Sequence, residues 1–242
     1  MANEFVEHRA LAAIRFLDEE TRLPVRAPLA VEGGGLKLAR NLSGMLVVVD
    51  APGFTDYADH FDLPETPPPE VTFTLTATDP SRTYLARRFS VTLPRDPTPG
   101  PDESLPADSI FKPVDVTLYP SAVARASAGS AVVRLKVTDD NGVPLPGALV
   151  QLTLAAPSIV RRGLCDSRGE ALVLVPGIPI ADWSDPTATT EFDLTVKAAW
   201  IAGAPPPDPD ALAAVLQDAD GTIQVAAGAE IFRTISLEWI EL

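Results

Sequence analysis

Hydrophobic and polar residues alternate along most of the chain, and the pattern is clearest between residues 133 and 151. Val133, Leu135 and Val137 alternate with charged or polar neighbours, as in a strand that buries one face and leaves the other in water. The residues Asp-Asn-Gly follow at 140–142, and the alternation resumes after two prolines. Because Asn and Gly tolerate the positive φ of tight turns, the stretch predicts a β-hairpin.

The first half of the chain repeats this plan. Residues 10–31 contain an apolar strand, an acidic turn, a proline and a second apolar strand. Each half then has an Asn/Asp-x-x-Gly turn and an apolar strand that ends in Pro-Gly, at 41–53 and at 166–177. Two closing strands complete each half, at 71–79 and 84–93 in the first and at 191–200 and 229–240 in the second. The ordered agreement of these features predicts that one unit has been duplicated.

The composition favours short strands over long helices. The 242 residues include 25 Pro and 15 Gly but few aromatic residues, which is typical of many strands joined by rigid turns. We therefore predict an all-β protein of two tandem antiparallel β-sandwiches, at 1–95 and 111–242, joined by a proline-rich linker at 96–110. The strand expected near 111–120 could close either sandwich, and we assign it to the second.

Two insertions interrupt the shared plan. The first, at 54–70, is acidic and aromatic. The second, at 202–221, contains the clearest helix pattern, a short helix at 211–217 that Asp208 or Asp210 could cap. Because both insertions lie outside the repeated scaffold, we expect function to reside in them.

The second half resembles a known group of domains. Its residues VRLKVTDDNGVPLPGALVQL and CDSRGEALVLVPG are similar to carboxypeptidase regulatory-like domains and to the wider transthyretin-like and Cna B-type group. The resembling elements are the strand that ends in Asp139, the turn through Gly142, the pattern at 144–150 and the turn at 166–169. The resemblance implies an antiparallel sandwich of seven or eight strands. It implies little about function, because such sandwiches serve as scaffold, spacer, adhesion or binding modules.

Charge and cysteine content exclude several classes of protein. The net charge of −14 disfavours binding to nucleic acid or to anionic membranes. Cys165 is the single cysteine, which excludes an internal disulfide and a cysteine-based zinc site. The first residues lack a signal-peptide pattern, and no apolar run is long enough to span a membrane. We expect a cytoplasmic protein that could leave the cell as part of a particle.

Residues able to carry catalysis are sparse. Enzymes among the resembled sandwiches need several histidines, either with a Tyr-Arg-Gly-Ser tail in hydroxyisourate hydrolases or with two tyrosines around iron in intradiol dioxygenases. This chain has only His8 and His60 and ends in LEWIEL. Tyr57 and His60 could share one side of a helical turn, but they supply too few ligands for iron. We therefore predict that the chain is not an enzyme and has no catalytic, metal or cofactor site.

Exposed aromatic and apolar residues outside the shared plan are the candidate contacts with other proteins. These candidates are Phe54, Tyr57, Phe61, Trp183, Leu212 and Leu216.

We predict a non-catalytic structural or protein-interaction module. Tandem sandwiches of this resemblance are commonly exported, whereas this chain shows no export signal. An accessory component of a large particle assembled inside the cell, such as a phage tail-like or contractile injection apparatus, reconciles the two facts. Its partners would then be other proteins of the assembly, and a homo-oligomer is compatible with the sequence. A carbohydrate-binding or adhesion module that uses Trp183 is the alternative.

Overall fold

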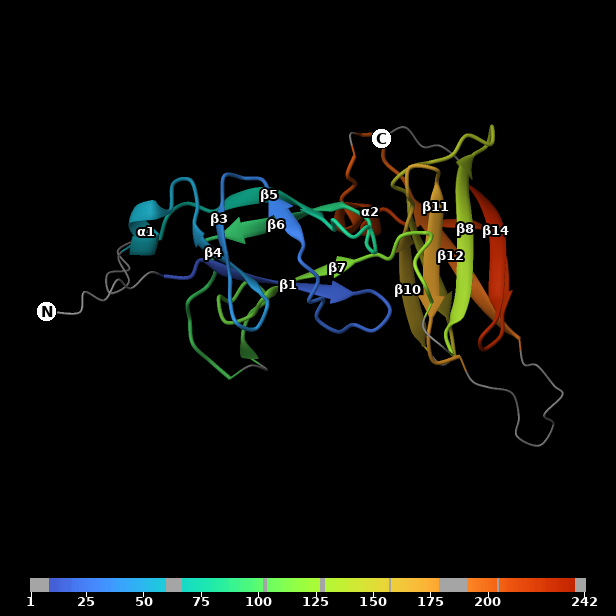
Figure 1. The fold of residues 1–242 in the computed structure, drawn as a ribbon, viewed down its shortest axis with the longest axis horizontal. Helices are drawn as coiled ribbons and strands as arrows, with labels where there is room; N and C mark the ends of the chain where they lie inside the picture. Colours follow the sequence, from blue (N-terminus) through green and yellow to red (C-terminus); the bar gives the residue numbers. More distant parts are fainter. Residues whose placement is uncertain are drawn as a thin grey trace, which may run out of the picture. The chain divides into compact units, whose positions relative to one another are not determined.

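The chain is almost entirely β structure, which confirms the predicted fold class (Figure 1). The computed structural model describes residues 9–59, 67–101, 104–126, 129–156, 158–178, 191–203 and 205–237. Fourteen strands and two short helices form within these residues. The chain divides into two compact units, the first made of Met1–Leu17, Leu23–Ala77 and Arg88–Thr117, the second of Asp18–Arg22, Thr78–Arg87 and Leu118–Leu242.

The first seven strands form two sheets. Their bounds are β1 (Ala12–Asp18), β2 (Ala30–Glu32), β3 (Lys37–Arg40), β4 (Leu46–Asp50), β5 (Val71–Thr78), β6 (Arg87–Leu93) and β7 (Val114–Leu118), with helix α1 (Thr55–Asp59) after β4. One sheet has the order β3-β4-β1-β7 and the other β2-β5-β6. Phe16 of β1 meets Phe89 of β6 edge-on, with ring centroids 5.8 Å apart, so the two sheets share one buried core.

The next seven strands also form two sheets. Their bounds are β8 (Ala131–Asp139), β9 (Leu149–Leu154), β10 (Ile159–Leu164), β11 (Glu170–Val175), β12 (Phe192–Ala199), β13 (Gln217–Val225) and β14 (Glu230–Leu237), with helix α2 (Pro209–Ala213) before β13. The sheets have the orders β11-β8-β14 and β10-β9-β12-β13. Val133 and Leu135 of β8 belong to the same buried cluster as Leu152 of β9 and Leu194 of β12, which makes this pair of sheets a β-sandwich.

The expected hairpin at 133–151 is wrong, because its two strands lie in different sheets. β8 belongs to the sheet β11-β8-β14 and β9 to the facing one, so residues 140–148 carry the chain across the core. Between the two arms, an isolated bridge joins Thr138 to Pro144. Proline supplies no N–H to extend such a ladder, and burial of Leu145 draws the chain inward.

The same crossing occurs between β1 and β2. Leu17 forms an isolated bridge with Pro24, as Thr138 does with Pro144. The N–H of Val25 then donates to the carbonyl oxygen of Phe16 at 2.8 Å, and β2 continues in the other sheet. The parallel that the sequence showed between the two halves therefore extends to their crossings.

The two Asn/Asp-x-x-Gly turns also form matching hydrogen bonds. The N–H of Gly44 donates to the carbonyl oxygen of Asn41, and the Asn41 side chain accepts the N–H of Met45. In the same way, the N–H of Gly169 donates to the carbonyl oxygen of Asp166, and the Asp166 carboxylate accepts the N–H of Glu170. Both glycines have positive φ, 83° for Gly44 and 72° for Gly169, which explains why glycine stands there.

Strand order agrees between the two sets of seven strands at six positions. The sequence β4-β1-β7 corresponds to β11-β8-β14, and β2-β5-β6 corresponds to β9-β12-β13. The third strand of each set differs, since β3 pairs with β4 whereas β10 pairs with β9. The third strands, β3 and β10, are therefore edge strands of sheets that do not correspond, although the strand order agrees for the other six strands of each set.

Two strand assignments differ from expectation. We assigned the strand near 111–120 to the second sandwich, but β7 lies beside β1 in a sheet of the first seven strands. The pairing of β14 with β8 is parallel, which departs from the antiparallel arrangement expected throughout. The carbonyl of Ala229 accepts the N–H of Val132 at 2.7 Å, so β14 enters the sheet alongside the start of β8.

The helix of the second insertion is shorter than predicted. α2 ends at Ala213, and the expected helical residue Gln217 instead begins β13, where it pairs with Ala198. Asp208 is the N-cap, since its carboxylate accepts the N–H groups of Asp210 and the following residue. Of the two predicted caps, Asp208 and Asp210, the structure has Asp208, and pairing with β12 ends the helix early.

The segment expected as a linker folds around a buried arginine. Arg95, which is 8% exposed, donates from Nε and Nη2 to the carbonyl oxygen of Ser109 at 3.1 and 3.0 Å, and from Nη2 to that of Ala107 at 3.0 Å. Asp96 forms a bridge with Ser109. These bonds involve residues 95–96 and 107–109, all within the first compact unit, while the predicted domain bounds stay a prediction.

We predict that Arg95→Met lowers the free energy of unfolding of the first unit by about 2 kcal/mol, because buried carbonyl groups lose their donors. A urea titration followed by circular dichroism measures the loss, and amide hydrogen exchange in β6 assigns it to this unit. Arg26→Met, at an exposed position, is the control. Equal stabilities of the two variants would contradict the structural role of Arg95.

Candidate functional site

The outer face of the sheet β11-β8-β14 carries an ordered grid of side chains. Val133 and Leu135 of β8 point into the core, so the intervening residues of that strand face outward. The strand registers align three outward rows: Leu174, Val132 and Glu230; Leu172, Arg134 and Phe232; Glu170, Lys136 and Thr234. The face is therefore apolar at one end and charged at the other.

A segment after β7 covers the apolar end of this face. Val132, Leu172 and Leu174 form a small buried cluster, against which Ala124 packs. Arg134 donates from Nη1 to the carbonyl oxygen of Ala122, which ties the segment to the middle row. The cover stops there, because Phe232 of the same row is 65% exposed.

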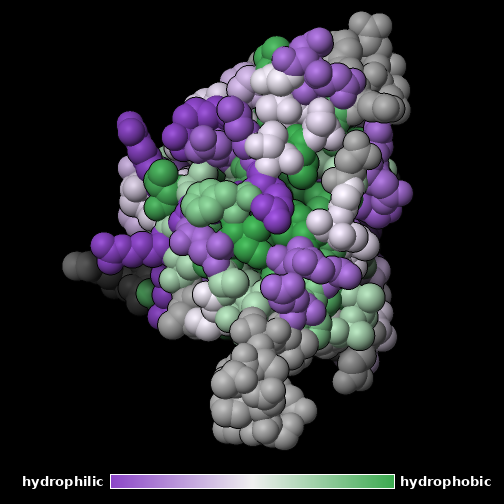
Figure 2. Space-filling model, turned by 90° about the vertical axis from the view of Figure 1, so that its right-hand side faces the viewer, coloured by the Kyte–Doolittle hydropathy of each residue, from purple (hydrophilic) through white to green (hydrophobic). Residues whose placement is uncertain are grey.

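A cavity of about 300 Å³ lies where the cover ends, with Ala122, Arg134, Lys136, Phe232 and Thr234 among its walls. Figure 2 shows the side of the molecule on which β8 and β14 lie. Hydrophobic residues gather there in a hollow near the centre, and hydrophilic residues border it. We call this cavity the β8–β14 groove.

Arg134 and Phe232 form the wall of the groove together. The guanidinium carbon of Arg134 lies 6.0 Å from the centroid of the Phe232 ring, within the range of a cation–π contact. Arg134 Nε also donates to Glu230 Oε1 at 2.7 Å. The ion pair holds the guanidinium beside the ring and leaves much of the ring open to solvent.

Arg233 makes the free edge of β14 unsuited to pairing with another strand. It aligns with Leu135 of β8 and so lies on the inward side of β14, between Ile231 and Ile235. Charged side chains on the inward side of an edge strand discourage addition of a further strand. The outer face, rather than the strand edge, is therefore the surface that β14 offers.

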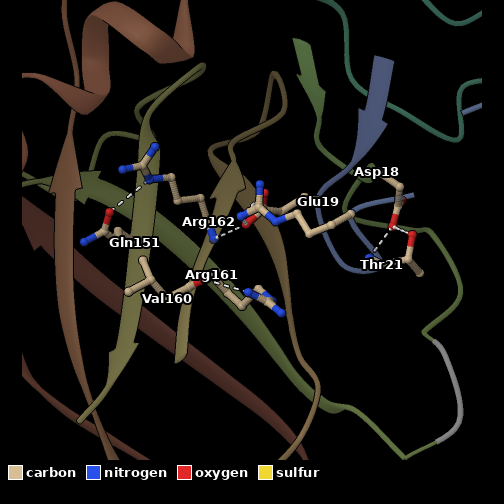
Figure 3. A network of polar contacts seen from close by, with 8 residues as sticks. Asp18, Glu19, Thr21, Gln151, Val160, Arg161 and Arg162 are labelled. Carbon is tan, nitrogen blue, oxygen red and sulfur yellow. Dashed lines mark hydrogen bonds and ion pairs between the residues drawn. The ribbon is translucent and has the colours of Figure 1, made fainter. Parts of the chain in front are cut away.

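A buried carboxylate lies at a second cluster, in the turn Asp18–Arg22 of the second unit (Figure 3). Glu19 is 3% exposed, and its Oε1 accepts the N–H of Arg162 at 2.9 Å. Oε2 lies 2.9 Å from Arg22 Nη2 as an ion pair but accepts no hydrogen bond within the part of the chain that is described. Burial raises the pKa of Glu19, and the charges of Arg22, Arg161 and Arg162 oppose the rise.

The contacts of Glu19 give it a structural role. Arg162 continues the network on its other side, where Nε donates to Gln151 Oε1 at 2.9 Å (Figure 3). Asp18 closes the turn by accepting the N–H and the hydroxyl of Thr21 at 2.7 and 2.8 Å. Glu19 thus fastens its turn to β10, and its burial keeps it from exchanging protons with a substrate.

A second cavity, of about 430 Å³, is lined by polar and apolar residues that include Asp18, Tyr84 and Ser121. The hydroxyl of Tyr84 donates to Asp18 Oδ2 at 2.9 Å. Burial and this bond raise the pKa of the phenol, so Tyr84 is a hydrogen-bond donor at neutral pH and not a base.

We next considered metal binding and thiol reactivity among the described residues. No group of three His, Cys, Asp or Glu residues there could hold a metal ion. Cys165 is buried, and burial together with Asp166 raises the pKa of its thiol, which disfavours the reactive thiolate. No helix among the described residues is both long and apolar enough to cross a membrane.

The two candidate contacts from the first insertion that can be located lie together. Phe54 is 1% exposed and packs edge-on against Tyr57 and Phe73, with ring centroids 6.5 and 6.0 Å away. The guanidinium of Arg9 lies 4.1 Å from the centroid of the Tyr57 ring. Phe54 therefore belongs to the buried core, whereas Tyr57 is half-buried.

The candidates from the second half are likewise part of a core or outside the described residues. Leu212 is buried with Tyr119 and Leu149, and the half-buried Leu216 packs against the same cluster. Phe61 and Trp183 lie outside the described residues, as does His60. Partner binding at the six candidates stays a prediction.

Sequence reasoning missed the groove, although one signal of it was present. In the strand pattern of 229–240, Ile231 and Ile235 mark the buried face, which places Phe232 among the outward positions. A large aromatic residue on the polar face of a strand is a sign of a contact surface. The alternation of hydrophobic and polar residues did not indicate that the segment through Ala122 and Ala124 covers part of this sheet face.

Comparison with known proteins gives only distant structural likeness. Neither a family model nor a curated protein matches the chain. A catechol 1,2-dioxygenase from an Acinetobacter species is 15% identical, with 49% of this chain and 55% of that chain covered and a TM-score of 0.24. BcpA, the major pilin subunit of Bacillus cereus, is 14% identical, with 95% and 59% covered and a TM-score of 0.27. The shaft pilin SpaA of Lactobacillus rhamnosus GG is 10% identical, with 98% of each chain covered and a TM-score of 0.22.

This chain therefore spans between half and two thirds of the length of the dioxygenase and of BcpA. TM-scores this low support no statement about what the chain does. Its own residues have to carry that inference.

We predict that Glu19 makes the second unit less stable as pH rises. Because its pKa is raised, the stability that it contributes is fully present below its ordinary value of 4.5 and is lost as pH rises through the folded-state pKa. Glu19→Gln keeps an acceptor for Arg162 without the titration. The free energy of unfolding of the natural chain, minus that of the variant, should therefore fall as pH increases.

Urea titrations at pH values on either side of 4.5 test this. Tryptophan fluorescence reports on the second unit, since all three tryptophans fall within it. Asp50→Asn in the first unit is a control of opposite sign, because the hydrogen bond from Lys37 lowers the pKa of Asp50. Its effect should be followed by circular dichroism and should grow as pH rises. A Glu19 difference that is flat or that grows with pH would contradict the prediction.

Proposed function

We propose that this chain is a non-catalytic structural or protein-interaction module that binds another protein through the β8–β14 groove. The observation that carries the proposal is Phe232, whose ring is 65% exposed on a sheet face, beside a cavity and the guanidinium of Arg134. Aromatic residues and Arg are enriched among the residues that dominate binding energy at protein interfaces.

We further propose that the scaffold is two tandem copies of one sandwich of the carboxypeptidase regulatory-like type. Matching strand order, two matching crossings and two matching Asn/Asp-x-x-Gly turns support this. The copies differ in what surrounds the scaffold, including the groove, which is described for the second copy alone. A duplicated scaffold with one specialised face suits a module that positions a partner.

The reactive groups that can be located support a role without catalysis. The pKa values of the Cys165 thiol and the Tyr84 phenol are both raised, which keeps them protonated, and Glu19 is buried and forms an ion pair with Arg22. A general base or nucleophile needs the opposite arrangement, a reactive form that reaches a substrate.

Membership of a large particle, such as a phage tail-like or contractile injection apparatus, is the more specific proposal. It rests on the sequence features that suggested it, and the identity of the bound protein decides it. Sheath, tube or baseplate proteins bound through the groove would support it.

We predict that Phe232→Ala weakens capture of the partner by about tenfold or more, because the ring supplies the central contact. The tagged chain and its variants are used side by side to capture proteins from native lysate, followed by affinity measurement with the purified partner. Phe111→Ala is the matched control, since Phe111 is an exposed phenylalanine of the first unit with an exposure of 58%.

A partner that binds the natural chain and both variants equally would exclude the groove. Failure to retain any protein, together with a glycan bound regardless of Phe232, would favour the carbohydrate-binding alternative. Turnover of a substrate by the purified chain would overturn the non-catalytic assignment.

A further inference from the structure

We propose that Arg233 holds the free edge of β14 closed to a second copy of this chain, and that the two copies pair strand to strand through this edge when the guanidinium is removed. The inference does not rest on the proposed function, because it concerns the edge of the sheet and not its outer face. It follows from the strand registers, from a hydrogen bond at the edge and from a matching arrangement in β10.

β14 has one edge whose backbone groups point away from its neighbour. It is the last strand in the sheet order β11-β8-β14, so β8 pairs with its other edge (Figure 1). The carbonyl oxygen of Ala229 accepts the N–H of Val132, and the backbone of Arg233, four positions further, therefore also faces β8. The backbone groups of Phe232 and Thr234 then point to the free edge. A row of this kind is a template for pairing with another strand.

The outer side of β14 complements itself in an antiparallel pair. In a pairing centred on Phe232, this ring lies opposite its counterpart in the second copy, and Glu230 lies opposite Thr234 of the second copy. Aromatic pairs that face each other across strands stabilise a sheet. The strand that fits this edge best on its outer side is therefore the same strand of another copy.

Arg233 opposes this pairing in two ways. Its register partner in β8 is the core residue Leu135, which places Arg233 on the inward side, where it would lie opposite Ile231 of the second copy. A charge would then be enclosed between apolar residues, which is costly. Arg233 Nη1 also donates to the carbonyl oxygen of Phe232 at 3.3 Å and so occupies an acceptor that an added strand would need.

The edge strand β10 of the facing sheet carries the same arrangement. Arg161 pairs across strands with the core residue Leu152, so it too lies on the inward side. Its Nη1 donates to the carbonyl oxygen of the preceding residue, Val160, at 2.9 Å (Figure 3). The carboxylate of Glu19 in addition accepts the N–H of Arg162 at this edge at 2.9 Å (Figure 3). Because a second side chain closes the edge of β10, this strand is a matched control for β14.

The test is the self-association of the full chain, measured by sedimentation velocity over a series of concentrations. Arg233→Ile completes the apolar alternation of Ile231 and Ile235 on the inward side. We expect this variant to self-associate at least about tenfold more tightly than the natural chain. Arg161→Ile is the matched change in β10 and should keep the mass of the natural chain, because Glu19 still occupies that edge.

A proline at the free edge distinguishes strand pairing from a general loss of solubility. Thr234→Pro removes an N–H that points away from β8, and proline is tolerated at such positions of edge strands. Combined with Arg233→Ile, it should restore the mass of the natural chain. Circular dichroism confirms that each variant is folded. If Arg233→Ile does not fold, Arg233→Thr takes its place, since threonine suits strands and carries no charge.

Reversible dimers of the folded Arg233 variant that the proline abolishes are the expected result. A folded Arg233 variant that keeps the mass of the natural chain at every concentration would overturn the inference. Association that persists in the presence of Thr234→Pro would do so as well, because the contact would then not be at this edge. Equal association of Arg161→Ile would contradict the difference between the two edges on which the inference depends.

Discussion

The turn after β8 is the constraint on which the second unit depends. The carboxylate of Asp139 accepts the N–H groups of Asn141 and Val143 at 2.9 and 2.7 Å, which reverses the chain within a few residues. The carbonyl oxygen of Val137 then accepts the N–H of Leu145 at 3.0 Å. Leu145 is buried, and the chain passes on to β9 in the facing sheet. The strands from β10 to β14 all belong to the two sheets that this crossing connects.

Turn chemistry was the most predictable part of the fold, and strand partners were the least. The residues after Asp139 form a tight turn as their types indicate, but alternation is the same whichever neighbour a strand pairs with. The pattern therefore identified β8 and β9 correctly and joined them wrongly. The helix at 211–217 failed for a related reason: Gln217 satisfies its backbone in β13, and pairing with β12 outweighs local helix preference.

The groove shows the same division between local pattern and tertiary context. The outward position of Phe232 follows from the strand pattern alone. That Arg134 is paired with Glu230, and that the segment through Ala122 lies beside it, depends on contacts between residues that are not neighbours in sequence. In the first unit, Phe54 is buried just before the helix that begins at Thr55, although its acidic neighbours in sequence suggested a surface segment.

The different place of the third strand in each set has a consequence for recognition. In the first set, β3 widens the sheet that contains β1 to four strands. In the second set, β10 lies in the other sheet, and the sheet β11-β8-β14 has only three strands. Every outward side chain of β8 is then one strand away from a border. A ligand that lies over Arg134 and Lys136 therefore reaches a border of the sheet on either side after one further strand, because this sheet lacks a fourth strand like the one that β3 supplies in the first set.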